Sequence, residues 1–436
     1  MRSLFYLGTV LIMSQFLVSQ TLNDITYLTQ TSLTGSARYT AMAGAFGALG
    51  GDLTAISNNP AASSVFLNTE IGGSLNFQER ENESKYYGEF TSLNEEAFYF
   101  DQLGAVFVFN NTNEENPWSR ISAAINVNRV TNFDNQTSLS GINNKSIADY
   151  FLYYANGIAF EDIQLYDDET ISDIYRYLGD EIGFGAQQAF LGYQSYIIDP
   201  LSPNDLEKSY ISNVSSNKYR NNLDIINSGF HRKTSFNFSA LYQNILHIGV
   251  NLNSHKLEFR NNQDFFEYDQ DIDSYIYNVN FDNDLISYGD GFSIQFGGIL
   301  KLKNIRIGAT YDSPQWIDIK DETQQKLSAY RFEDDFEIQE IIDPEITNSY
   351  SPYRLKISSK TSLSFAYIFN MSGLISIDYS SQNLSNSYLS QNDTSEFLNS
   401  VNTEVSKTLN PINILKIGGE YRFKDISFRA GYYYQT

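Results

Sequence analysis

The second half of the chain repeats one pattern: an alternating segment, a short turn, a second alternating segment and a long polar stretch. Apolar residues occupy every second position of residues 236–242 and again of residues 246–252, with a turn at Gln243-Asn244 between them. Successive side chains of a strand point to opposite faces, so a period of two predicts strands with one apolar and one polar face. The pattern recurs in residues 292–311, 363–379 and 415–434, with turns at Lys303-Asn304, Met371-Ser372 and Lys424-Asp425.

Both soluble sandwiches and membrane barrels contain such hairpins, and three features favour the barrel. The alternating segments reach roughly 10 residues, the length that spans a bilayer at a tilt. The turns are short at one end, whereas the connections at the other end are much longer. Tyr and Phe, with 32 and 31 copies, gather near the segment ends as an interfacial girdle requires. The predicted fold class is therefore all-β, a transmembrane antiparallel β-barrel.

Further strands are predicted near residues 71–78, 103–110 and 121–130, which brings the expected total to about eleven or twelve. Single-chain bacterial barrels normally close with an even number of strands. Because the sequence ends at Thr436, two residues after the aromatic residues 432–434, we expect a barrel that is incomplete at its C-terminus. The predicted barrel covers residues 69–436.

The first twenty residues are typical of a secretory signal peptide. Arg2 supplies the positive end, residues 4–18 are largely apolar, and Ser19-Gln20 mark a plausible cleavage region. The sequence has no cysteine, which excludes a lipoprotein anchor and a disulfide framework. The predicted location is the bacterial outer membrane, among its lipids.

Two regions lack the alternation expected of strands in the barrel wall. Residues 21–68 are rich in Gly, Ala, Ser and Thr, and residues 132–229 form a long insert. Within the insert, residues 147–160 and 171–196 have apolar spacing typical of short amphipathic helices in a large external loop.

Charge and motifs exclude several classes of function. A formal net charge of -23 excludes a nucleic-acid-binding protein, whose affinity comes from neutralising phosphates. The glycine-rich residues 44–51 are not followed by Gly-Lys-Ser/Thr, and no Gly-x-Ser-x-Gly motif occurs. We therefore expect neither an enzyme nor a cofactor or metal site.

The three histidines can be interpreted in two ways. His247 and His255 lie on the polar face of one strand, roughly 27 Å apart at eight residues, too far to share a metal. Polar histidines inside the lumen are the preferred interpretation. A haem receptor that uses one of them as an axial ligand is an alternative.

Charged residues on the polar faces also carry two interpretations. Asp378, Glu420 and Lys416 share these faces with arginines, and such charges can pair with each other and hold an internal plug. Alternatively, one or two of the arginines bind the carboxylate of a ligand, because the planar guanidinium group matches the geometry of a carboxylate. The candidates are Arg306, Arg422 and Arg429.

The order of several motifs resembles the long-chain fatty acid transporter (FadL) family. Residues 36–52 form a Gly/Ala-rich stretch that ends in Asp52, and Asn58-Asn59-Pro60-Ala61 follows. Residues 305–314, 362–379 and 415–432 are similar to later strands of the family. The resemblance touches nearly the whole predicted mature chain.

The resemblance implies a fourteen-stranded barrel whose lumen is closed by an N-terminal hatch. Asn59, Pro60 and Ala61 would form the hatch motif, and the preceding hatch turn would contain Gly44, Gly47, Gly51 and Asp52. Members of the family take hydrophobic ligands into an external apolar groove, pass them to the lumen and release them sideways through a gap in the wall. Candidates for the groove, which no motif fixes, are Phe151, Tyr153, Tyr154, Ile158 and Phe160.

The expected function is therefore passive uptake of hydrophobic compounds, with long-chain fatty acids as the leading substrates. Relatives of this shape also act in secretion systems of the Bacteroidetes type, as carriers of exported proteins. The Tyr-, Asn- and Ser-rich composition fits that phylum. A partner role in secretion or surface assembly is thus the competing hypothesis.

Overall fold

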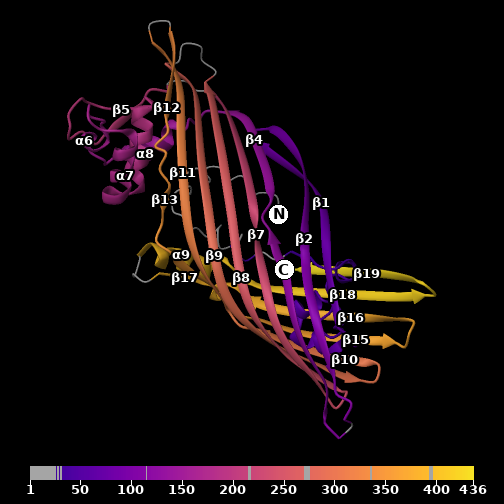
Figure 1. The fold of residues 1–436 in the computed structure, drawn as a ribbon. Coiled ribbons are helices and arrows are strands. Elements are labelled where there is room, and N and C mark those ends of the chain that lie inside the picture. Colours follow the sequence, from indigo (N-terminus) through magenta and orange to yellow (C-terminus); the bar gives the residue numbers. More distant parts are fainter. Residues whose placement is uncertain are drawn as a thin grey trace.

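The computed structural model describes Thr26, Thr29 and residues 32–113, 115–214, 218–269, 275–333, 336–391 and 396–436. The predicted signal peptide lies outside the described residues. Within them, most of the chain forms one 17-stranded antiparallel sheet, and two short strands form a second sheet (Figure 1). The all-β prediction is confirmed.

The elements follow one another in a simple order. The N-terminal part holds the short helices α3 (Ala37–Ala41), α4 (Ala55–Asn58) and η2 (Pro60–Val65). The large sheet contains β1 (Glu70–Tyr86), β2 (Glu89–Asn110), β3 (Trp118–Asn132), β4 (Asn135–Asn143), β7 (Tyr219–Tyr242), β8 (Leu246–Asp269), β9 (Ile276–Leu302), β10 (Ile305–Asp312), β11 (Gln315–Glu333), β12 (Phe336–Ile342), β13 (Asn348–Ser349), β14 (Tyr353–Ile357), β15 (Lys360–Phe369), β16 (Gly373–Asn383), β17 (Tyr388–Ser390), β18 (Pro411–Phe423) and β19 (Ile426–Gln435).

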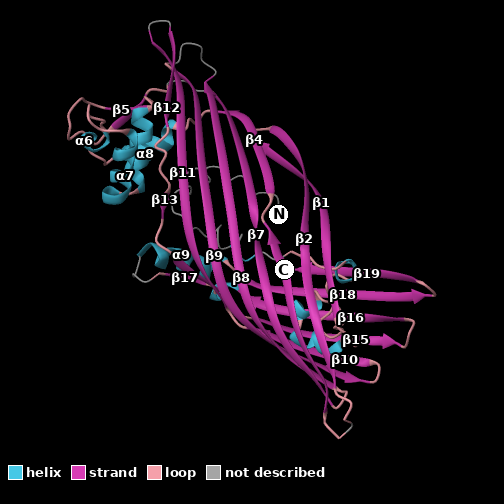
Figure 2. Cartoon of the chain, viewed as in Figure 1, coloured by secondary structure: helices cyan, strands magenta, loops and turns pink. Residues whose placement is uncertain are grey.

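Helices occur mainly between β4 and β7 and between β16 and β18 (Figure 2). The first group contains α5 (Ala148–Ala155), α6 (Phe160–Ile163), α7 (Ile171–Tyr177), the π-helical turn η3 (Leu178–Ile182), α8 (Phe184–Gln194) and the small strands β5 (Ile198–Pro200) and β6 (Tyr210–Ser212). The second contains η4 (Leu384–Asn386), before β17, and α9 (Glu396–Thr408). None of the described helices is long and apolar enough to cross a membrane.

The register joins several labelled strands into longer passes. β9 pairs with β10 as far as Gln295↔Asp312 and with β11 from Phe292↔Trp316, so β10 and β11 form one pass with a register shift at Ser313-Pro314. The same reasoning joins β3 with β4, β12 through β15, and β16 with β17. The described residues thus contain eleven antiparallel passes, as expected.

The outer face carries an apolar band beside the short turns. On β8, Leu246, Ile248 and Leu252 point outward and are exposed, whereas the alternate residues His247 and Asn251 are buried. The predicted parity is confirmed. Beyond residue 252 the outward positions of β8 become polar, and those of β11 change in the same way after Trp316. An apolar band of this kind is what a transmembrane barrel presents to lipid.

The strands continue far past the apolar band, where we expected long loops. Residues 254–268 of β8 pair with residues 278–292 of β9, and β11 continues the same panel to Glu333 (Figure 1). These extensions are polar on much of both faces, so the alternation that reveals a half-buried strand is absent there. The expectation of long polar loops at these positions was wrong.

The hairpin turns lie where the sequence places them. Gln243 and Asn244 have φ values of 50° and 58°, and Lys303 and Lys424 also adopt positive φ. Such left-handed conformations match the twist of paired strands in tight hairpins. The third turn begins at Asn370, just before the predicted Met371-Ser372.

The helical insert is shorter than the predicted range 132–229. β4 takes residues 135–143, and β7 begins at Tyr219, so strands occupy both ends of that range. Helices fall in the predicted segments 147–160 and 171–196 and are interrupted at Gly157 and Gly183, which have positive φ. We call residues 144–214 the insert.

The insert packs against the inner face of the long panel. Phe151 and Tyr175 are wholly buried in a cluster with Phe265 of β8, Phe281 of β9 and Leu327 of β11. These three strand residues share the inward parity of the polar lumen positions. The insert therefore covers the far end of the interior.

The sheet curls around the N-terminal segment, residues 32–66, which we call the hatch. Leu53 of the hatch lies against Gly72 of β1, and Ala43 lies against Gly431 of β19. β1 and β19 are the first and last described passes, and no ladder joins them among the described pairs. Because this small segment contacts both edge strands, β1 and β19, it lies inside the curl of the sheet.

Candidate functional site

Glycines on the inner faces of the strands let the hatch backbone approach the wall. A Cβ atom at Gly249 would lie 2.5 Å from the carbonyl carbon of Pro60, and one at Gly308 would lie 2.3 Å from the Gly47 oxygen. Real Cβ atoms do not approach so closely, so only glycine fits these wall positions. Comparable contacts occur at Gly297, Gly418 and Gly431.

Polar wall side chains satisfy the backbone of the hatch, which has little regular structure. Asn251 Nδ2 donates to Ile56 O at 2.9 Å, and Asn237 Nδ2 donates to Pro60 O at 2.8 Å. Buried carbonyl groups need such partners when no ladder or helix supplies them. The same role is played by Lys233, Gln295, Arg120, Asn126 and Arg306, which donate to Ser57, Ser57 and Asn58, Ser64, Leu53 and Leu49 respectively.

Asn59 connects the two ends of the hatch. Its Nδ2 donates to Gly47 O at 2.6 Å and to Gly298 O at 3.2 Å, and its Oδ1 accepts from Ala61 N at 3.0 Å. Asn59 caps η2, and Pro60 occupies the first position of that helix, where its missing N–H costs nothing. The predicted motif thus lies at the centre of the hatch.

The other predicted hatch residues shape its turns. Gly44 and Gly51 adopt positive φ, and Gly47 N donates to Asp378 Oδ2 of β16 at 2.8 Å. Asp52 accepts from Ser36 Oγ at 2.6 Å and from Thr54 N at 2.8 Å. These contacts explain why the sequence needs glycine and a carboxylate here.

One buried carboxylate gathers three arginines near the short turns. Glu420 Oε2 accepts from Arg38 Nε at 2.8 Å and from Arg429 Nε at 2.9 Å, and Oε1 accepts from Arg422 Nε at 2.7 Å. Arg306 donates to Leu49 O of the hatch at 2.6 Å. The inward parity of these charges was predictable, but Arg38 was missed because its partner is 382 residues away.

The three histidines all lie inside the sheet. His231 Nε2 is 3.0 Å from His255 Nδ1, and His255 Nε2 is 2.8 Å from Ser293 Oγ. His247 Nδ1 is 2.9 Å from Ser64 Oγ of the hatch. This arrangement favours a structural role over axial ligation of haem. The His231–His255 contact joins two strands, so no local sequence pattern reveals it.

The wall changes character where β2 leaves β3. Their ladder ends at Gln102↔Asn128, while β4 continues only along β7. The open edge of β4 instead meets side chains of β1: Arg80 donates to Asp134 O, Asn82 to Gln136 O and Ser84 to Ser138 O. Side chains therefore replace a backbone ladder along this line, which we call the seam.

An apolar layer crosses the interior between the hatch and the insert. Leu257 of β8, Ile317 of β11 and Leu355 of β14 are buried in it, and the ring of Phe133 meets that of Phe259 edge to face with centroids 5.3 Å apart. The helix α9 contributes three further residues, Leu398, Val401 and Val405. We call this the middle cluster.

The candidate groove residues divide into buried and exposed positions. Phe151 and Phe160 lie in the core of the insert, and Ile158 packs against that core. Tyr154 is half-buried, whereas Tyr153 is 72 % exposed. The structure thus brings Phe151, Ile158 and Phe160 together as internal packing and leaves Tyr153 on the surface.

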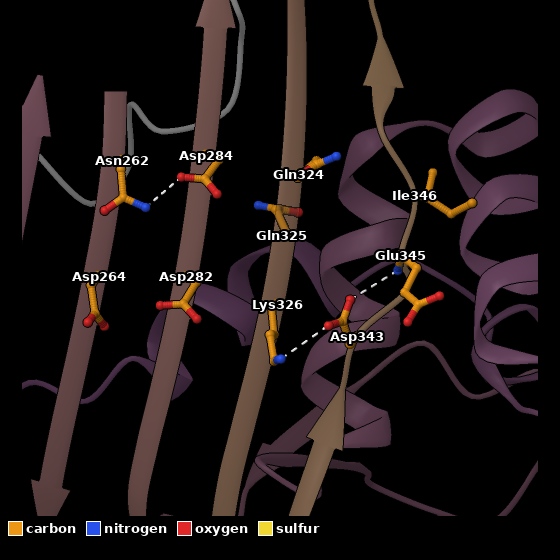
Figure 3. Close-up of a pocket in the computed structure, with 10 residues that line it drawn as sticks. All are labelled: Asn262, Asp264, Asp282, Asp284, Gln324, Gln325, Lys326, Asp343, Glu345 and Ile346. Atoms are coloured by element: carbon orange, nitrogen blue, oxygen red, sulfur yellow. Dashed lines mark hydrogen bonds and ion pairs between the residues drawn. The ribbon is translucent and has the colours of Figure 1, made fainter. Parts of the chain in front are cut away.

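Two cavities differ sharply in chemistry. One, of about 570 Å³, is lined mainly by polar groups of β8, β9 and β11, including Asp264, Asp282 and Lys326, which pairs with Asp343 at 3.2 Å (Figure 3). Burial and the neighbouring Asp264 raise the pKa of Asp282. This lining does not suit a hydrophobic ligand.

The second cavity is an apolar groove of about 620 Å³ in the outer band. Phe238, Ile248 and Phe296 line it, and all three are exposed on the outer face of the sheet. Its position faces membrane lipid rather than the interior.

No family model and no curated protein matches the chain. Solved structures do match. The toluene transporter TodX of Pseudomonas putida is 13 % identical with a TM-score of 0.43, and the match covers 93 % of this chain and 85 % of that one. The monoaromatic hydrocarbon channel CymD is 10 % identical with a TM-score of 0.45, at 93 % and 85 % coverage.

Proposed function

We propose that this protein carries hydrophobic compounds passively across the outer membrane, with long-chain fatty acids as the leading substrate class. The observation that supports this most is the middle cluster, an apolar layer inside an otherwise polar interior. Burying each methylene group is worth about 0.8 kcal/mol, so an apolar layer can hold an acyl chain without any chemical step. No catalytic residue or cofactor enters this proposal.

The proposed path runs from the insert to the middle cluster and then towards the hatch. α9 contributes Leu398, Val401 and Val405 to the middle cluster, so movement of α9 would exchange these contacts for contacts with a ligand. In this proposal the hatch blocks the direct route through the lumen towards the short turns. The seam between β1 and β4 is the proposed sideways exit, because side chains can separate there without breaking a ladder.

Four groups of residues are proposed to act on the ligand. Phe151, Ile158 and Phe160 would shape the entrance by packing the insert, and Tyr153 and Tyr154 would meet the ligand first. The arginines 306, 422 and 429 would act on an anionic head group only after it reaches the hatch. The hatch itself would control passage.

Bound molecules test this proposal directly. The protein is purified from membranes in mild detergent and extracted, and the extract is analysed by mass spectrometry. Stoichiometric long-chain carboxylates or other apolar compounds are the expected result. Extracts that match those of an unrelated barrel purified in the same way would contradict the proposal.

A second candidate function is a partner role in secretion or surface assembly. Leu201 and Leu206 of the insert are 62 % and 68 % exposed, and exposed apolar side chains are what a partner protein can cover. Purification of the barrel together with one exported protein, lost on changing both leucines to serine, would favour this role. Retention of the exported protein by the double variant would contradict it.

A further inference from the structure

The interior carries a surplus of positive charge at the short-turn end. Arg38 of the hatch and Arg306, Arg422 and Arg429 of the wall lie there, whereas the chain as a whole has a formal charge of -23. Among the described residues, Glu420 is the one carboxylate that forms ion pairs with these arginines. The net charge of this group is therefore positive, whereas that of the whole chain is negative.

The hydrogen bonds leave much of each guanidinium unused. Arg38, Arg422 and Arg429 all reach Glu420 through Nε, at 2.7 to 2.9 Å, and their terminal nitrogens have no hydrogen-bond partner among the described residues. The Arg422 side chain is 52 % exposed and that of Arg429 is 30 % exposed, so both can reach a ligand from the aqueous side.

Arg306 adds a buried donor to the same group. Its Nη1 donates to Leu49 O, but its Nε is buried and has no partner within the described part of the chain. A buried donor without an acceptor is costly, and an anion would supply the missing acceptor.

We propose that Arg38, Arg306, Arg422 and Arg429 form a binding site for a phosphate group presented from the short-turn side. The three arginines around Glu420 keep two positive charges in excess, which matches a doubly charged oxyanion better than a single carboxylate. The planar fork of arginine suits phosphate oxygens. All three wall arginines face inward, so the ligand enters the mouth below the hatch. This site does not depend on what passes through the interior.

Inorganic phosphate is the first probe. The full-length protein in detergent is titrated with phosphate at constant ionic strength, and binding is followed by calorimetry or by phosphorus NMR. R422Q and R429Q should each weaken binding several-fold, and the double variant should weaken it at least ten-fold. E420Q should instead strengthen binding several-fold, because it frees three guanidinium groups. Binding that all these variants leave unchanged, or that E420Q weakens, would overturn the proposal.

R354Q is the matched control. Arg354 is an exposed arginine of β14 that pairs with Asp318 far from the short turns, so its loss should leave phosphate binding unchanged. If R354Q weakens binding as much as R422Q does, the effect is general charge and the site is refuted. R422Q is the least disruptive of the site variants because Arg422 is half exposed.

A second probe separates the two sources of a phosphate group. Dihexanoyl phosphatidic acid carries the head group of a lipid in a soluble form. Binding more than ten-fold tighter than inorganic phosphate, and sensitive to R422Q, would identify a lipid head group as the ligand. Equal or weaker binding with the same sensitivity would identify a soluble phosphate compound. Absence of binding by both probes would refute the site.

Discussion

Gly249 of β8 lies against Pro60 of the hatch so closely that a Cβ atom would sit 2.5 Å from the Pro60 carbonyl carbon and oxygen. The contact is between two backbones, so neither side can yield by rotating a side chain. The wall and the hatch are therefore fitted to each other at the level of the main chain.

Changing Gly249 to alanine should push the hatch away from β8. The free energy of unfolding should fall by about 1–3 kcal/mol, as is usual when an extra group is forced into a packed site. Faster proteolysis or hydrogen exchange of residues 55–66 in the variant would be the readout. Gly298→Ala is the control, because its Cβ would meet nothing nearer than His247 O at 3.6 Å. Equal protection of the hatch in both variants would contradict the fit.

Asn59 should be as important as the glycines that surround it. Asn59→Ala removes the bonds to Gly47 O and Gly298 O and leaves buried carbonyls without a donor, at a cost of about 1–3 kcal/mol. Hydrogen exchange of the hatch should rise in this variant. Asn410→Ala, at an exposed asparagine before β18, should have no effect. A hatch that stays protected without Asn59 would show that the motif does not hold it.

Much of this arrangement was predictable from sequence, and the rest was not, for identifiable reasons. Alternation located the band of strands such as β8 and β9 because one face meets lipid and the other meets polar groups. It failed for residues 254–269 and 276–291, where polar residues interrupt the apolar ones, such as Leu257 and Phe281, on the inward face. Contacts between distant segments, such as Arg38 with Glu420, leave no local pattern. The hatch was expected from a resemblance to a family rather than from periodicity.

Two variants of the insert distinguish a residue that packs its core from a residue proposed to capture a ligand. Phe151→Ser should destabilise the insert by about 3–5 kcal/mol, as loss of a buried phenylalanine does, because Phe151 is wholly buried. Tyr153→Ser removes an exposed ring and should leave the fold intact. Proteolysis within residues 144–214 reports the difference. If Tyr153→Ser also leaves capture of hydrophobic compounds unchanged, Tyr153 is not part of the entrance.

The insert should also respond to pH through Glu267, which lies beyond the apolar band. Burial raises the pKa of Glu267 to about 7, while Ser146 Oγ and Ile147 N donate to its carboxylate. The folded state holds this proton more tightly than the unfolded chain, whose glutamate titrates near 4.5. The stabilisation is therefore complete below pH 4.5 and is lost as the pH rises to about 7.

The loss amounts to something on the order of 3 kcal/mol. Hydrogen exchange of α5 at pH 5 and pH 8 measures it, after correction for the intrinsic exchange rate. Glu267→Gln should remove this dependence, because the amide does not titrate. A pH dependence that persists in the variant would assign the effect to other groups.

The central claim is that hydrophobic compounds cross the outer membrane through this protein. The most direct measurement is uptake of a labelled long-chain fatty acid and of a labelled aromatic hydrocarbon by a Gram-negative host that lacks its own carrier, with and without this protein. The account predicts saturable entry of at least one compound that depends on the protein and exceeds the empty host several-fold. Equal entry in both strains, with the barrel folded in the membrane, would contradict it.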